Sequence, residues 1–272
     1  ALAIITPSAT TGHVGVALSV TTGATGGRTP ITYSLTGTLI AGLTFDTTDG
    51  SIRGIPTAAG TANYTVTATD ANGASITSGS FSITIAAATL ATPSSVVVSK
   101  VTGSNTSLTV SFTGDANAAS YLVKVYSNIG LTTQVGSNWT SFTTGATNTI
   151  TGLTANTSYW VTVQAIGNSD YNSSSVSASA TQKTNSVFTV HFDTQGSNVI
   201  ADRTFTTGTA LGGTNPTPTA RSGFAFLGWS LSTDGLTTTP STYVPLTAGD
   251  VTFYAQWIET PTDTSLSVTV NP

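Results

Sequence analysis

Turn-forming residues interrupt short runs of alternating apolar and polar residues along most of the chain, at intervals of about 8–12 residues. In Ala62–Thr69 and Ser80–Ile85, apolar residues occupy every second position. A period of two places the apolar side chains on one face of a β-strand. Thr is the commonest residue type, at about a fifth of the chain, and β-branched side chains favour strands. The pattern therefore predicts an all-β protein.

Composition excludes several classes of function. The net charge is −4, and the seven Lys and Arg residues are scattered, whereas nucleic-acid binding needs a basic stripe that neutralises phosphates. The same charge balance argues against binding to an anionic membrane surface. No apolar run approaches the roughly 18 residues of a membrane-spanning helix. The absence of Cys excludes disulfides, thiolate metal sites and cysteine nucleophiles.

Short polar stretches divide the chain into three segments and a tail. These stretches are Ala87–Thr92 and Thr184–Ser186, and the tail follows Trp257. Because the chain begins with Ala1 rather than Met, we expect either a mature chain after signal-peptide removal or a piece of a longer protein. The predicted domains are residues 1–88, 89–184 and 185–258, with a linker and a strand-like tail at 259–272.

The first segment contains ITYSL, GLTFDTTDGSIRGIP and YTVTATDANG in that order. The order resembles the immunoglobulin/cadherin-like repeat of bacterial surface proteins, which carries P-x-x-Y-S-L, G-L-x-x-D, T-G-x-I-x-G-x-P and a closing V-T-A-T-D. Asp49 stands where that family usually has Thr. We expect a type I′ hairpin turn at Asp70–Gly73, because Asn and Gly accept positive φ. The residues that match the repeat are Pro30, Tyr33, Gly42, Leu43, Asp46, Gly50, Ile52, Gly54, Pro56 and Val66–Asp70.

The second segment reads as seven strands. It resembles a fibronectin type III domain, because LTANTSY precedes the sixth strand and Tyr159 sits where that family places its tyrosine corner. Phe112 takes the second-strand position that usually holds Trp, and Tyr121 is the third-strand aromatic residue. The predicted strands are Val96–Val101, Ser107–Phe112, Ser120–Ser127, Trp139–Thr143, Thr147–Thr151, Ser158–Ile166 and Ser174–Thr181.

The third segment contains FTVHFD, PTARSGFAFLGW and VTFYAQW. These stretches resemble the Listeria–Bacteroides repeat, also called the internalin B-repeat, with its P-x-R-x-G-Y-x-F-x-G-W and L-Y-A-x-W signatures. Gln195-Gly196 stands where that family usually has Gly-Gly. The resemblance implies a small β-grasp-like domain that occurs in tandem on bacterial surface proteins and carries no enzymatic activity.

The tail contains one strand-like run, Thr264–Val270. Leu266, Val268 and Val270 fall on one face of this run, and hydroxyl residues fall on the other. An amphipathic strand without a partner can complete the edge of a neighbour's sheet. A head-to-tail contact of this kind does not close on itself and makes a filament. The alternatives are that the tail packs back on the third segment or begins a further domain.

The candidate catalytic and metal-binding residues are few. No triad order or metal-ligand spacing accompanies His13, in a Gly-rich loop, or His191, in a strand, so we expect structural roles for both. Asp46 and Asp49 could form a carboxylate pair, but the resembled family has a structural turn there. Oxygen atoms of Asp70, Asn72 and Asp49 could contribute to a Ca²⁺ site, yet Ca²⁺ requires six to eight oxygen ligands. We expect no metal and no cofactor.

Aromatic residues offer the remaining contact sites. Trp160 alternates with Tyr159, so one of the two rings should point outward, and an exposed Trp160 is a candidate surface contact. Trp139 is also near the surface of its sandwich. The aromatic residues of the third segment match the signature of its repeat and are expected in the core: Phe224, Phe226, Trp229, Tyr243, Tyr254 and Trp257.

Together these features predict two immunoglobulin-like β-sandwiches followed by a β-grasp-like domain. We interpret the chain as a non-catalytic, extracellular structural protein of the prokaryotic cell surface, and as a fibre subunit that polymerises with itself through its C-terminal strand. The first alternative is an adhesin or glycan-binding stalk, whose partners would be surface glycans or other surface proteins. The second is an accessory region of a secreted carbohydrate-active enzyme.

Overall fold

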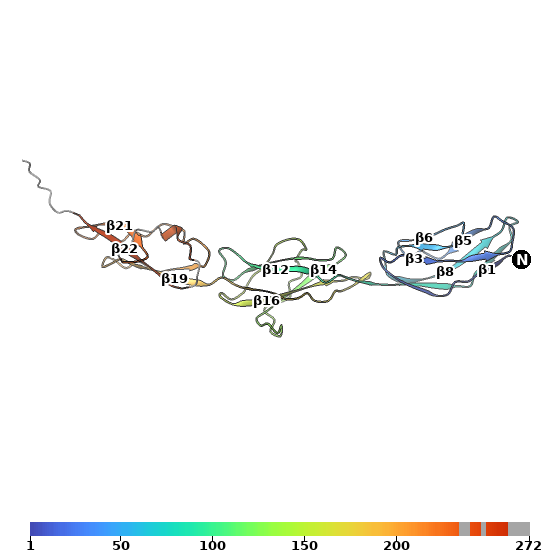
Figure 1. Ribbon diagram of the computed structural model, residues 1–272, viewed down its shortest axis with the longest axis horizontal. Coiled ribbons are helices and arrows are strands. Elements are labelled where there is room, and N and C mark those ends of the chain that lie inside the picture. The colour runs from blue at the N-terminus through green and yellow to red at the C-terminus, as the bar shows by residue number, and fades with distance from the viewer. Residues whose placement is uncertain (234–239, 246–248, 261–272) are drawn as a thin grey trace, which may run out of the picture.

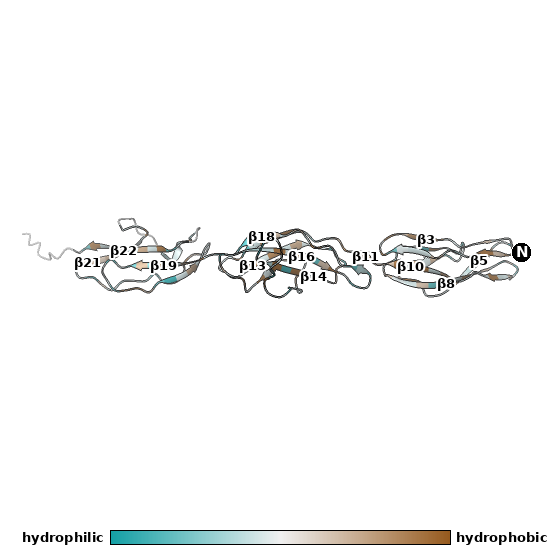
Figure 2. Cartoon of the chain, turned by 90° about the horizontal axis from the view of Figure 1, so that it is seen from below, coloured by the Kyte–Doolittle hydropathy of each residue, from teal (hydrophilic) through white to brown (hydrophobic). Residues whose placement is uncertain are grey.

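The computed structural model describes residues 1–233, 240–245 and 249–260. Three domains follow one another along a single long axis, with the N-terminus at one end of the molecule (Figure 1). Each domain has its own cluster of buried apolar side chains. The strands carry both hydrophobic and hydrophilic residues (Figure 2), and buried positions alternate with more exposed ones along strands such as Phe81–Ala86 and Leu108–Thr113. Among the described residues, no helix is long and apolar enough to span a membrane.

The first domain is a β-sandwich. One sheet has the order β2-β10-β8-β5, with β9 also paired to β8, and the opposing sheet has the order β3-β7-β6. The side chains of Tyr64, Val66 and Ala68 on β8 are buried, and the intervening Thr residues face outward. The strands are β1 (Ala3–Ile5), β2 (Thr10–His13), β3 (Leu18–Val20), β4 (Gly23–Thr25), β5 (Thr32–Thr36), β6 (Leu43–Phe45), β7 (Ile52–Gly54), β8 (Gly60–Thr69), β9 (Ser75–Thr77) and β10 (Phe81–Ala86).

The hairpin between β8 and β9 differs from the predicted type I′ turn. The Gly73 N–H donates to the Asp70 carbonyl at 2.9 Å, and only Gly73 in this turn has positive φ, at 81°. The Asp70 carboxylate explains the difference, because it accepts the N–H groups of Asn72 and Ala74 at 2.9 and 3.0 Å. These bonds hold Asn72 at negative φ. The hairpin therefore contains a type I turn followed by Gly73 at positive φ.

The second domain is also a sandwich of two sheets, with the orders β12-β13-β15 and β14-β16-β18. Inward-facing residues such as Val110, Val123 and Val163 are fully buried between the sheets. A short parallel pair, β11 with β17, lies at the end nearest the first domain, where Figure 2 labels β11. The strands are β11 (Ala88–Thr89), β12 (Ser94–Lys100), β13 (Leu108–Thr113), β14 (Ser120–Tyr126), β15 (Asn148–Ile150), β16 (Ser158–Ile166), β17 (Tyr171–Asn172) and β18 (Ala180–Lys183).

The predicted extents of two strands in this domain were wrong. Trp139–Thr143 forms only isolated bridges, at Trp139 and Ser141, because the Asn148 side chain bonds both the N–H and the carbonyl of Thr143. The predicted Ser174–Thr181 becomes regular only at Ala180.

Serine side chains replace strand pairing before β18. The N–H groups of Ala165 and Val163 on β16 each donate to a serine hydroxyl, Ser174 and Ser177, at 3.0 Å. The first domain uses the same arrangement, because the Val66 N–H donates to the Ser78 hydroxyl at 3.0 Å. In both sandwiches, therefore, serine hydroxyls accept hydrogen bonds from buried backbone N–H groups where the edge of the sheet is irregular.

The third domain is one mixed sheet with the order β20-β19-β22-β21, in which the central strands β19 and β22 are parallel. This order agrees with the predicted β-grasp-like fold. Leu211 and Tyr243 pack with the sheet's aromatic residues, so the core lies on one side of the sheet. The elements are β19 (Val187–Asp193), β20 (Arg203–Thr206), β21 (Phe224–Ser230), the 3₁₀ helix η1 (Pro240–Thr242) and β22 (Val251–Glu259).

The junction between the first and second domains is held by several hydrogen bonds. Linker strand β11 pairs with β17, and the Ala88 and Leu90 N–H groups donate to Asp170 and Asn172 carbonyls at 3.1 and 3.0 Å. The Asp170 carboxylate also accepts the Ala59 N–H from the first domain at 2.8 Å. The Tyr171 ring packs against the cores of both domains. The loop around β17 therefore joins the two sandwiches.

The junction between the second and third domains is held by a buried amide. Asn185 is 5% exposed, and its side-chain N–H₂ donates to the carbonyls of Val101 and Ser104, each at 2.8 Å. The next residue, Ser186, accepts the Thr207 N–H of the third domain at 3.0 Å. Neither junction is a free linker of the Gly/Ser type.

Candidate interaction surface

The sheet β14-β16-β18 has one face in the core of the second domain and one face toward solvent. On β16, Tyr159 is 2% exposed and Trp160, the next residue, is only partly buried on the opposite face. The Tyr159 hydroxyl accepts the Thr154 N–H at 2.8 Å, which is the upstream bond of a tyrosine corner. The buried bond fixes Tyr159 inward, so the alternation of the strand turns Trp160 outward, as one of the two rings was predicted to do.

A second aromatic ring lies beside Trp160. Tyr126 on β14 is its direct partner in the antiparallel register, and Thr181 on β18 is its partner on the other side. Side chains directly opposite each other in such a pair have Cβ atoms about 4.5–5.5 Å apart. Trp160 and Tyr126 therefore occupy directly opposed positions on the outer face of the sheet, and we refer to them as the aromatic pair.

Two lysines occupy the diagonal positions around Trp160. Lys124 pairs with Thr162, two residues further along β16, and Lys183 pairs with Ser158, two residues before Trp160. Diagonal neighbours lie about 7–8 Å away, within reach of a long side chain. Neither lysine makes an ion pair within the described part of the chain. The outward residues of these three strands include no carboxylate.

The hydrogen-bonding groups of this aromatic pair differ from those of the third-domain tryptophans. In the third domain, the indole N–H groups of Trp229 and Trp257 donate to backbone carbonyls at 2.8 and 3.0 Å. In residues 1–233, 240–245 and 249–260, by contrast, neither the Trp160 indole N–H nor the Tyr126 hydroxyl has a hydrogen-bond partner. Neighbouring polar groups are used internally: the Gln164 amide donates to the Ser174 carbonyl at 2.8 Å, and the Thr181 hydroxyl donates to the Tyr159 carbonyl at 3.0 Å.

The other three tryptophans pack against the cores of their domains. Trp229 is 2% exposed, and its ring meets Phe192 and Phe226 edge-on with centroids 5.1 and 5.6 Å apart. Trp257 packs against the same cluster, and Trp139 packs partly buried against the core of the second domain. Trp229 is therefore a core residue, as expected from its repeat signature, whereas Trp160 is partly exposed.

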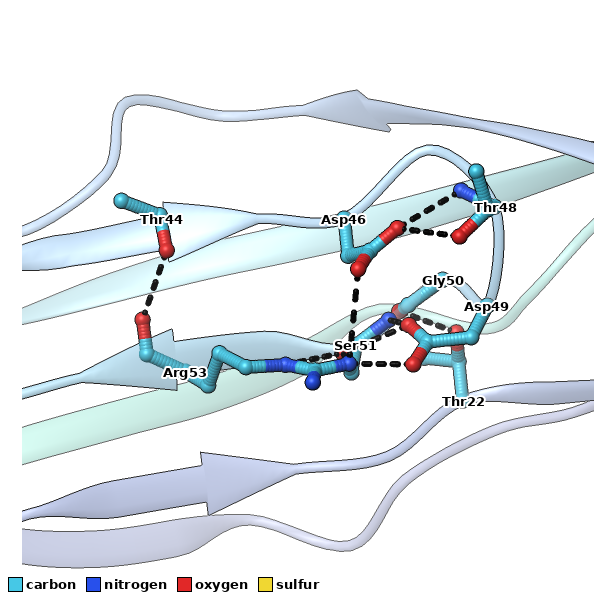
Figure 3. A network of polar contacts seen from close by, with 8 residues as sticks. All are labelled: Thr22, Thr44, Asp46, Thr48, Asp49, Gly50, Ser51 and Arg53. Atoms are coloured by element: carbon cyan, nitrogen blue, oxygen red, sulfur yellow. Dashed lines mark hydrogen bonds and ion pairs between the residues drawn. The ribbon is translucent and has the colours of Figure 1, made fainter.

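The carboxylates Asp46 and Asp49 serve a turn of the first domain (Figure 3). The hydroxyl and N–H of Thr48 donate to Asp46, and those of Ser51 donate to Asp49, at 2.6 and 2.9 Å in both cases. These bonds from Ser51, reinforced by the Arg53 guanidinium, lower the pKa of Asp49 to about 2. Bonds from Thr48 lower the pKa of Asp46. Both carboxylates are ionised and bonded within the turn, so neither is poised as a general acid.

The remaining candidate residues also have local roles. The Asp70 carboxylate accepts three backbone N–H groups, that of Arg28 among them, which lowers its pKa. Among the described residues, no group of three or more His, Asp or Glu side chains could hold a metal ion. His13 ends strand β2 rather than lying in a loop, and His191 Nδ1 is 2.9 Å from Asp202. Leu266, Val268 and Val270 of the tail lie outside the described residues.

Sequence reasoning named Trp160 as a candidate contact residue but did not name the residues around it. Tyr126, Lys124 and Lys183 are 34, 36 and 23 residues from Trp160 in sequence. They become its neighbours only through the register of β14 and β18 with β16. A period-two count along each strand would have shown that Lys124 and Tyr126 face outward together, but not what they face across the sheet.

Two segments of the chain match family models. Residues 1–86 match the family described as "Putative Ig domain", and residues 188–256 match the Listeria-Bacteroides repeat domain. Both domain types are typical of surface proteins. No curated protein matches the chain. Among solved structures, the crystal structure of chicken CNTN1 FN1-FN3 domains matches with 16% identity and a TM-score of 0.31, over 66% of this chain and 68% of that chain.

The matches agree with the resemblances drawn from the sequence for the first and third domains. Between them lies a two-sheet domain with the tyrosine-corner bond of Tyr159, the feature that identified the middle segment. The chain is thus similar to surface-associated proteins in its first and third domains, an immunoglobulin-like domain and a Listeria-Bacteroides repeat, with a two-sheet β-sandwich between them.

Proposed function

We propose that this chain is a non-catalytic structural rod of the prokaryotic cell surface, outside the cell, that assembles head to tail through its C-terminal strand. The observation that carries the proposal is the end-to-end arrangement of three domains with both junctions hydrogen-bonded (Figure 1). Domains joined by free linkers move relative to one another. Junctions that bury Asn185 and share the Tyr171 ring suit a spacer of fixed length.

The non-catalytic part is supported by what the ionisable groups do. General acid–base and nucleophilic catalysis need a side chain with a suitable pKa that is free to reach a substrate. Asp46, Asp49 and Asp70 are each engaged in turn hydrogen bonds that stabilise the carboxylate. These arrangements build loops, and they leave those carboxylates unsuited to proton transfer.

The assembly part is supported by the geometry of the rod. Strand β22, which the tail follows in sequence, lies at the end of the molecule opposite the N-terminus (Figure 1). A strand donated from one end to the other end of the next copy propagates along the axis and does not close. At the N-terminal end, β1 pairs only with β4 within the described residues, which leaves an edge to which a strand can add.

Electron microscopy of the purified chain tests this proposal. We expect filaments from the full chain and single rods from a chain that lacks residues 264–272. Leu266→Asp with Val268→Asp should also abolish filaments, because it places charge on the apolar face of the strand. The matched control, Ser265→Ala with Ser267→Ala, alters the other face and should polymerise. Full-length rods that stay single at high concentration, or filaments that survive the deletion, would contradict the assembly.

A further inference from the structure

We propose that the outer face of sheet β14-β16-β18 binds an acidic polysaccharide, with Trp160 and Tyr126 stacking on sugar rings and Lys124 and Lys183 pairing with anionic groups. The inference takes from the proposed function only that the chain lies outside the cell. It is independent of head-to-tail assembly.

The first observation is that, within the described residues, both members of the aromatic pair have unused hydrogen-bond donors. Buried Trp and Tyr residues normally place their N–H and O–H groups in hydrogen bonds, and exposed ones are enriched where a ligand supplies the missing partner. Trp229 and Trp257 follow the first pattern through their backbone acceptors. In the described part of the chain, Trp160 and Tyr126 leave both donors open, side by side on one face. Two flat rings at opposed positions on neighbouring strands, each with an open donor, can meet the C–H faces and hydroxyl groups of consecutive sugars.

The second step is the position of the cations. The chain has three lysines, and two of them, Lys124 and Lys183, lie on opposite strands diagonal to Trp160. The third lysine, Lys100, is on the other sheet. A ring stacked on Trp160 would therefore have an ammonium group on either side, placed to meet a carboxylate or sulfate on a sugar.

The third step is the charge around this face. Residues 89–184 contain three lysines and two aspartates, so the second domain carries a net positive charge within a chain of net charge −4. Both aspartates lie near the first domain, where Asp115 accepts the Ala91 N–H at 2.9 Å and Asp170 bonds the junction. Neither is on the outward positions of the three strands, and this charge complementarity favours an anionic over a neutral polysaccharide.

The size of the face also suits a chain of sugars. Stable protein–protein interfaces bury about 800 Å² on each partner, with roughly 20–30 residues a side. The aromatic pair and its two lysines form a much smaller set, with Leu122, Gln164 and Ile166 as the remaining large outward side chains. Repeated short contacts along a polymer need only such a patch, because many rods can bind the same polysaccharide.

Binding of the full chain to immobilised polysaccharides tests the inference. The probes are polygalacturonate and alginate, which carry carboxylates, heparin, which carries mainly sulfates, and dextran and starch, which are neutral. We expect binding to a carboxylate or sulfate polymer that weakens at least tenfold between about 50 and 300 mM NaCl, and none to the neutral polymers. The carboxylate and sulfate arms identify which anion is recognised.

Variants separate stacking from charge pairing. Trp160→Thr should weaken binding at least tenfold, and Trp160→Phe, which keeps a ring without the N–H, should weaken it less. Lys124→Gln with Lys183→Gln should weaken binding at least tenfold and flatten its salt dependence. Thr65→Ala, on the outer face of the first domain, is the matched control and should bind normally. Because Phe keeps the ring, Trp160→Phe and the lysine variant remain decisive if Trp160→Thr destabilises the second domain.

Three results would overturn the inference. They are no binding to any anionic polymer, equal binding to neutral polymers, and binding that the Trp160 and lysine variants leave unchanged. A chain that lacks residues 264–272 keeps sheet β14-β16-β18 and can be tested in the same assay, so a failure of this inference is distinguishable from a failure of filament assembly.

Discussion

The two sandwiches of this chain are built alike inside and differently outside. In the first domain, β8 reads Tyr64-Thr65-Val66, and in the second domain, β16 reads Tyr159-Trp160-Val161. Both tyrosines are buried, and both hydroxyls accept a backbone N–H, from Ile40 at 3.3 Å and from Thr154 at 2.8 Å. The outward neighbour is a threonine in one domain and a tryptophan in the other.

The outer faces extend this contrast beyond single residues. Around Thr65 and Thr67, the partners on β5 and β9 are Thr36, Ser34 and Thr77, and the Thr67 and Thr77 hydroxyls bond each other at 2.8 Å. The first domain therefore satisfies much of its outer face with its own hydroxyls. The second domain presents unsatisfied aromatic donors between lysines. If both proposals hold, a common core pattern with different outward residues lets one sandwich serve as a spacer and the other as a contact surface.

The largest effects should come from truncating the buried tyrosines. Tyr64→Ala and Tyr159→Ala should each destabilise their own domain by about 3–5 kcal/mol, because each leaves a cavity and an unpaired N–H. Each variant should lower the unfolding transition of one sandwich in calorimetry and leave the other in place. Trp160→Thr, the adjacent position, should cost less than about 1 kcal/mol because its ring is outward. Loss of both transitions with one variant would show that the sandwiches unfold together.

The serine hydroxyls at the irregular edges should give intermediate and equal effects. Ser78→Ala and Ser177→Ala each remove the acceptor of a buried N–H, that of Val66 or Val163. Each should lower the free energy of unfolding of its domain by about 1–3 kcal/mol, the cost of an unpaired buried donor. Hydrogen exchange should show faster exchange of the same two amides. A neutral effect in one domain and not the other would mean that the two edges are satisfied differently.

The sequence predicts many of the side chains that are buried and many that face outward, but it does not predict which residues become neighbours across the sheet. Period-two alternation places Tyr159 in and Trp160 out, or the reverse, and the upstream motif of the tyrosine corner selects the first. The position of Lys183 beside Trp160 depends on a register set by a long irregular connection after β16. The serine acceptors escaped prediction because serine has no strand periodicity of its own, and its role appears only where a neighbouring ladder is broken.

The smallest expected effect is the dependence of stability on pH, which should differ between the two sandwiches because Asp49 belongs to the first and Asp115 to the second. Hydrogen bonds from Ser51, and then from Arg53, lower the pKa of Asp49 from 3.8 to about 2, and bonds from Ala91 and Asn117 lower the pKa of Asp115. A carboxylate with a lowered pKa in the folded state stabilises that state above the unfolded pKa, and the contribution is lost as the pH falls.

For Asp49 the loss should therefore occur between about pH 4 and pH 2, because the folded pKa is about 2. The midpoint temperature of the first domain should fall in this window, and Asp49→Asn should reduce the fall without changing the second domain. Asp115→Asn should act on the second domain alone. The two carboxylates lie in surface turns, so solvent screening keeps both effects small. A first-domain pH profile that Asp49→Asn leaves unchanged would mean that the turn bonds of Ser51 form equally well in the unfolded chain.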